Sequence, residues 1–255
     1  MSQSLLGEDA ARRNVNYLAS LDFIISLGFG LIMPLFPVYV ELLGGGGLEV
    51  GILFSSFVFT RALLATPFGN LSDRLGRKNI ILIGAFLYAI LAILFTVPDT
   101  WFGLIFVRAF QGVASAMVWP VSEALVIDSS PVDKRGASMG KIVMASNLGF
   151  VVGPFVGGIL FMFASQTLGY SDSDAYKFPF YFTAVLALVG TLLTWRFVTD
   201  AKRPEAERTR LTMGELIRPS GVEPERLRYL RTLYLNAMIE GFSFASIMPL
   251  MVLFM

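Results

Sequence analysis

The chain has 255 residues, of which 55% are hydrophobic and 15% charged, and its mean hydropathy is +0.67. This composition excludes an ordinary soluble domain and indicates a membrane protein. Cysteine and histidine are absent from the sequence, which excludes disulfide scaffolds, thiolate metal sites and histidine-based catalysis, and a net charge of +1 gives no reason to expect nucleic acid as a partner. We therefore expect no enzyme, no cofactor and no metal site.

Long apolar runs divide the chain into seven predicted membrane spans, each long enough to cross a bilayer as a helix. No cleavable signal peptide is expected before the first span, because the residues ahead of it are partly acidic. The fold class predicted is an all-α polytopic membrane protein with a six-helix bundle and one further transmembrane helix. The predicted spans are Tyr17–Val40, Val50–Phe68, Asn79–Val97, Trp101–Leu125, Ile142–Ala164, Phe178–Trp195 and Leu233–Phe254.

The Lys and Arg side chains of the connections fall almost entirely on one side of the membrane, and the connections on the other side contain only Lys177. Because cytoplasmic loops are enriched in Lys and Arg, the N-terminus is predicted to be cytoplasmic and the protein to lie in the cytoplasmic (inner) membrane. We expect three parts. They are a six-helix bundle over residues 1–197, a charged cytoplasmic linker over 198–230, and a seventh helix over 231–255 that begins a second bundle.

The connection after the second span, from Gly69 to Lys78, reads Gly-Asn-Leu-Ser-Asp-Arg-Leu-Gly-Arg-Lys. Its glycines permit a sharp turn, Asp73 suits a helix N-terminus, and Arg77 requires an anionic partner. Positive charge on a cytoplasmic turn would explain the same residues without a function. We interpret the loop as part of a gate, in which Glu123 is a partner for Arg74 or Arg77. The predicted gating residues are Gly69, Asp73, Arg74, Gly76, Arg77, Lys78 and Glu123.

Polar residues form a stripe along one face of the fourth span, because they follow Arg108 at helical spacing. A cation at that depth must face a cavity or a partner, or else be a structural arginine bonded to a neighbouring backbone. The stripe contains Arg108, Gln111, Gly112, Ser115 and Trp119.

In the fifth span, Gly149, Gly153 and Gly157 recur every four residues. Such a pattern produces a groove that admits another helix at close range, and Pro154 is expected to bend the span. General helix packing would also explain it, since glycine is common in membrane helices.

Together these motifs resemble those of the major facilitator superfamily. The loop from Gly69 to Lys78 is similar to the signature between that family's second and third helices. The Arg108, Gln111 and Gly112 positions resemble its Arg-x-x-Gln-Gly motif, which is associated there with proton coupling. The fifth span resembles the antiporter motif of drug:proton exchangers, at Gly140, Gly149, Gly153, Pro154, Gly157 and Gly158. The resemblance implies the first half of a family member plus its seventh helix.

Three more charged residues lie inside predicted spans. Asp22 resembles the family's first-helix aspartate, and its position makes direct pairing with Arg108 unexpected. Glu240 is expected to be a proton or substrate site, or otherwise to be paired with another group or in contact with water. Arg61 should face the bundle, either as a substrate contact or as a structural hydrogen-bond donor. The predicted proton-coupling and substrate residues are Arg108, Gln111, Gly112, Asp22, Glu240 and Arg61.

The function predicted is secondary active transport by alternating access, with proton-coupled export of a small hydrophobic solute. The alternatives are an uptake symporter of the same superfamily and a truncated, non-transporting membrane partner. A seven-helix receptor is disfavoured by the predicted orientation. The expected partners are membrane lipid, substrate, protons, and either a second half-transporter chain or a second copy, which would associate through the glycine groove of the fifth span.

Overall fold

A computed structural model of the chain describes residues 7–200 and four isolated positions, 232, 235, 236 and 239. The contacts divide the chain into two units, residues 1–203 and 204–255, and the helices below all belong to the first. Nearly all of the predicted linker and seventh span, including Glu240, lie outside the described residues.

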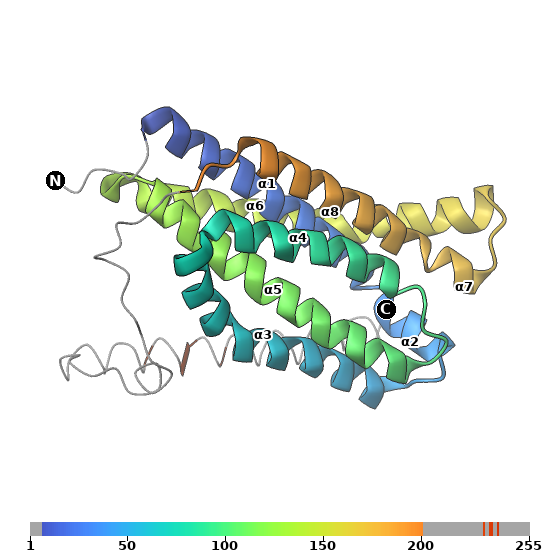
Figure 1. Cartoon of the computed structure of the whole chain (residues 1–255). Coiled ribbons are helices and arrows are strands. Elements are labelled where there is room, and N and C mark those ends of the chain that lie inside the picture. Colours follow the sequence, from blue (N-terminus) through green and yellow to red (C-terminus); the bar gives the residue numbers. More distant parts are fainter. Residues whose placement is uncertain (1–6, 201–231, 233–234, 237–238, 240–255) are drawn as a thin grey trace. The chain divides into compact units, whose positions relative to one another are not determined.

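The described residues contain six helices that are long and apolar enough to cross a membrane, which agrees with the six spans predicted for the first bundle. Figure 1 shows these helices running side by side. They are α1 (Glu8–Ile32), α3 (Gly47–Leu75), α4 (Arg77–Leu94), α5 (Trp101–Ser129), α6 (Arg135–Met162) and α8 (Phe178–Phe197). The shorter elements are α2 (Phe36–Leu42), a 3₁₀ turn (Val132–Lys134), a π turn (Phe163–Thr167) and α7 (Asp172–Ala175). The all-α class is confirmed.

The first predicted span is two helices rather than one. Helix α1 ends at Ile32, a turn follows, and α2 begins at Phe36. Pro34 lies in the turn and Pro37 in the first turn of α2, where its missing N–H removes no helical hydrogen bond. The break therefore follows from the two prolines.

The bundle is centred on α1 and α5. Helix α1 packs against α6 and α8, while α5 packs against α3 and α4. In the most apolar stretch of each helix, 67% of the residues are buried in α1 and α5, but only 17% in α3 and 22% in α6. Helices α3 and α6 therefore keep broad apolar faces that the described residues do not cover.

Candidate functional site

The connection between α3 and α4 is shorter than predicted. Helix α3 continues through Pro67 and Gly69 to Leu75, and α4 starts at Arg77, so the turn consists of Gly76 alone. The φ of +96° at Gly76 lies in the region that only glycine adopts readily, and a Cβ there would collide with the Asp200 carboxylate. Gly69 is a helical residue with open space around it, and its assignment to the turn was wrong.

Arg77 is buried between two carboxylates at the predicted cytoplasmic end of the bundle. Its Nε lies 2.7 Å from Asp128 Oδ2 and its Nη2 lies 2.9 Å from Asp73 Oδ1. The Arg77 side chain is 9% exposed, that of Asp128 3% and that of Asp73 36%. Because Asp73 lies in the last turn of α3 rather than at a helix N-terminus, its role is to pair with Arg77 across the turn. The ion pairs thus join α3, α4 and α5.

The predicted pairing of Glu123 with Arg74 or Arg77 is wrong. The ion pairs of Arg77 go to Asp73 and Asp128, and neither arginine pairs with Glu123 in the described part of the chain. Arg74 and Glu123 are both exposed. The physical reason is register along α5, since Asp128 lies more than one turn closer to the helix end than Glu123 and so reaches the level of the turn.

Residues just after α8 are fixed to the same end of the bundle by hydrogen bonds. The buried Asn14 side chain of α1 donates to the Ser129 hydroxyl at 3.0 Å and to the Thr199 carbonyl at 2.7 Å, and it accepts from the Thr199 N–H at 2.9 Å. Lys78 donates to the Trp195 carbonyl at 2.8 Å. The ends of α1, α4, α5 and α8 that are predicted to be cytoplasmic are therefore linked by polar contacts.

Arg108 has different surroundings, although its side chain is also buried, at 2% exposure. Its Nη1 donates to Gln111 Oε1 at 2.7 Å, its Nε has no hydrogen-bond partner among the described residues, and none of their carboxylates forms an ion pair with it. Five aromatic rings surround the guanidinium carbon. These rings, called the aromatic cage below, are Phe36 at 4.1 Å, Phe54 at 5.0 Å, Phe29 and Phe95 at 5.5 Å, and Phe57 at 5.9 Å.

The cage explains how a cation persists at this depth. The ring faces attract the guanidinium electrostatically, and such contacts contribute about 2 kcal/mol where water is excluded. The rings come from α1, α2 and α3 and from Phe95 at the end of α4, so the cage requires the bundle to be assembled. Arg108 is therefore held by rings and an amide, without a compensating carboxylate in the described bundle.

A second arginine faces the bundle from α3. The guanidinium carbon of Arg61 lies 4.6 Å from the Trp119 ring centre, and Arg61 is half-buried. Trp119 also contacts Phe29 and Phe150, with ring centres 6.3 Å apart in both pairs. The contacts of Trp119 with Arg61, Phe29 and Phe150 therefore connect α5 with α3, α1 and α6.

Asp22 is a buried carboxylate near the middle of α1, with 1% exposure. The Ser122 hydroxyl of α5 donates to its Oδ1 at 3.0 Å, and no cation among the described residues forms an ion pair with it. Ser122 and Arg108 are 14 residues apart on α5, or about 21 Å at the helical rise. Asp22 and Arg108 therefore occupy separate sites.

The glycine groove of α6 is filled by α1. An added Cβ would lie 2.6 Å from the Phe23 carbonyl oxygen at Gly149 and 2.7 Å from the Gly30 backbone at Gly153, and at Gly157 it would meet the Leu31 carbonyl. The groove therefore offers no free surface for the association with a second copy that was expected there, because α1 of the same chain approaches too closely for any side chain. Gly140 and Gly158 have open space around them, and α6 continues through Pro154.

Gly112 is also a packing residue. A Cβ there would lie 2.5 Å from the Phe57 carbonyl oxygen and 3.1 Å from the Arg61 N, so α5 meets the α3 backbone at this point. Its neighbour Gln111 is 6% exposed and bonds Arg108. Of the motif residues on α5, Arg108 and Gln111 therefore supply the polar groups and Gly112 supplies the space.

Two parts of this arrangement were missed by the sequence analysis. Asp128 is the main partner of Arg77, and the signal for it was a carboxylate next to the end of an apolar span, on the side where the basic loops lie. The aromatic cage had no such signal, since 23 phenylalanines are spread along the chain and only the fold selects five of them.

Six apolar helices enclosing buried charges define a polytopic membrane protein. The sequence pattern of the Major Facilitator Superfamily matches residues 18–255, and the chain belongs to that family. The family consists of transporters rather than enzymes, which agrees with the expectation from composition. The resemblance found in the three motifs is confirmed.

Relatives in sequence include the MFS-type transporter MJ1560 of Methanocaldococcus jannaschii, 34% identical over 188 residues. The quinolone resistance protein NorA of Staphylococcus aureus is 30% identical over 181 residues. The matches cover 74% and 71% of this chain, but 46% and 44% of those proteins. The chain therefore spans about half the length of the relatives that it matches.

Solved structures share the fold. The human organic anion transporter MFSD10 (TETRAN) matches with a TM-score of 0.63 and 22% identity, over 76% of this chain and 50% of that one. A bacterial homologue of the lysosomal transporter Spinster, in an inward-facing and unoccupied conformation, also matches with a TM-score of 0.63, at 17% identity over 78% of this chain and 45% of that one. At these identities the likeness concerns the arrangement of helices.

Proposed function

We propose that this chain forms the first bundle of a proton-coupled exporter of small hydrophobic solutes in the cytoplasmic membrane. The observation that supports the proposal most is Asp22, a buried carboxylate inside a membrane span whose contact is a hydroxyl. Acidic side chains inside membrane spans are characteristic of proton relays in transporters. Asp22 is thus suited to take up a proton from one side and release it to the other.

Export of hydrophobic solutes is supported by the similarity to NorA, a quinolone resistance protein. The glycine pattern of α6, which resembles the antiporter motif, has its own role in the packing of α1 against α6. Arg108 contributes a fixed positive charge in the same bundle, and Arg61 with Trp119 offers a cation and an aromatic face to a solute. Alternating access needs a second bundle, from further residues of the protein, another chain or a second copy.

The proposal is tested by solute flux in everted vesicles with an imposed pH gradient, for the chain alone and for the chain joined to a second bundle. A fluorescent quinolone is the probe. Asp22→Asn should lose accumulation driven by an acidic interior but retain exchange of quinolone without a gradient, since the amide keeps the shape but carries no proton. Asp174→Asn, a change at an exposed ion pair, is the control and should behave as the unmodified protein.

Wild-type accumulation by Asp22→Asn would contradict the assignment of the proton site. Movement of quinolone out of the everted vesicles under the same gradient would contradict export and identify an uptake symporter.

A further inference from the structure

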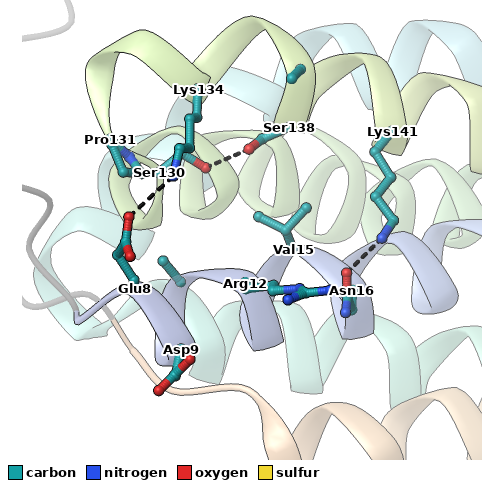
Figure 2. A pocket seen from close by; sticks show the side chains of 12 residues that line it. Glu8, Asp9, Arg12, Val15, Asn16, Ser130, Pro131, Lys134, Ser138 and Lys141 are labelled. Carbon is teal, nitrogen blue, oxygen red and sulfur yellow. Dashed lines mark hydrogen bonds and ion pairs between the residues drawn. The ribbon is translucent and has the colours of Figure 1, made fainter.

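A polar cavity of about 420 Å³ lies between the first turns of α1 and the start of α6. Figure 2 shows Lys134 and Lys141 reaching from the α6 side towards α1. There Lys134 pairs with Glu8 at 3.1 Å, and Lys141 donates to the Asn16 side-chain oxygen. The cavity is at the end of the bundle where the positive-inside pattern places the cytoplasmic membrane surface.

The charge of this cavity favours an anion. Arg12 also lines it and makes no hydrogen bond or ion pair with the residues that the structure describes. Of the two carboxylates in its lining, Glu8 is paired with Lys134, and in Figure 2 Asp9 points away from both lysines.

An apolar groove of about 560 Å³ lies on α6 between Met139 and Val151. Met144 and Leu148 belong to the groove and follow Lys141 by three and seven residues, so they lie on the same face of the helix, deeper in the membrane. Both are exposed, at 58% and 49%. A cationic cavity at the membrane surface is thus followed by an apolar surface directed towards the bilayer interior.

We propose that the cavity and the groove together bind an anionic phospholipid of the cytoplasmic leaflet. Its phosphate lies between Arg12 and Lys141, and an acyl chain follows Met144 and Leu148. A phosphate bonded to two cations makes charge-assisted hydrogen bonds, and the cytoplasmic leaflet supplies anionic lipids at this level. A soluble phosphate would satisfy the cavity but leave the groove unused, so the two-part surface favours the lipid.

The test is titration of the purified chain in detergent with short-chain phosphatidylglycerol, read by native mass spectrometry. Saturable binding is expected, and Arg12→Gln and Lys141→Gln should each weaken it about tenfold, because each removes one charge-assisted contact. Arg13→Gln is the matched control. Arg13 is the neighbouring cation, bonds Thr199 and does not line the cavity, so its loss should leave the affinity unchanged.

Three further measurements decide the source of the anion. Short-chain phosphatidylcholine, whose headgroup is neutral, and inorganic phosphate should both bind more weakly than phosphatidylglycerol. Met144→Ser should weaken lipid binding without changing the binding of inorganic phosphate. Equal lipid affinity in the Arg12, Lys141 and Arg13 variants would overturn the site, and phosphate binding as tight as lipid binding would overturn the lipid assignment.

Discussion

Arg77 and Arg108 are both buried arginines of the same bundle, but different groups compensate their charges. Arg77 lies between the carboxylates of Asp73 and Asp128, whereas Arg108 lies inside five phenylalanine rings and bonds Gln111. Carboxylates neutralise a charge, while rings only lower the cost of keeping it. The first arrangement stabilises the joint between helices, and the second leaves a positive charge that no carboxylate among the described residues neutralises.

Replacing each arginine in turn tests whether Arg77 and Arg108 contribute differently to stability. Arg77→Met should lower the free energy of unfolding by about 3 kcal/mol, because Asp128 then stays buried without this partner. Arg108→Met should stay within about 1 kcal/mol of the unmodified protein, since no carboxylate among the described residues loses a partner and an apolar chain suits the cage. Unfolding by a denaturing detergent measures both. Equal losses would show that the two arginines have the same role.

The packing of α1 on α6 also affects the surroundings of Arg108, because α1 carries Phe29 of the cage. Gly153→Ala should destabilise the bundle by about 2 kcal/mol, since its new methyl group would meet the Gly30 backbone. Gly158→Ala, at a position with open space, is the control and should have little effect. A small loss for Gly153→Ala would contradict the close contact between α1 and α6.

The contribution of the rings to Arg108 is tested with a smaller change. Phe36→Leu should cost about 1 kcal/mol more than Phe180→Leu, because both rings are buried but only Phe36 faces the guanidinium. In the Arg108→Met background this difference should disappear, as a double-mutant cycle requires. A difference that persists without Arg108 would assign the loss to packing alone.

The smallest effect is expected at Asp73, the more exposed partner of Arg77. Asp73→Asn should lower the free energy of unfolding by about 0.5 kcal/mol, whereas Asp128→Asn should cost several times as much because its pair is buried. In a protein with a second bundle, Asp73→Asn should also raise the accessibility of cavity positions from the cytoplasm. Thermal unfolding compares the two variants, and a larger loss at Asp73 would reverse their assigned roles.

The sequence predicted the features that depend on composition and spacing. Apolar length predicted the spans, and the spacing of the polar stripe located Arg108 on the correct helix, whereas Arg77, which was expected in the connection, is the first residue of α4. It did not predict which groups meet across helices, because rotation and register decide that. More than one turn of α5 separates the expected partner Glu123 from the actual partner Asp128, and the cage draws its rings from four helices, whose packing decides which phenylalanines meet.

We propose that Arg108 serves transport through a charge that no carboxylate of the described bundle neutralises. The most direct measurement compares quinolone accumulation driven by a pH gradient with gradient-free exchange for Arg108→Met in vesicles, using the form of the protein that shows flux. We expect a folded variant that exchanges quinolone but does not accumulate it. Accumulation at the level of the unmodified protein would contradict the claim.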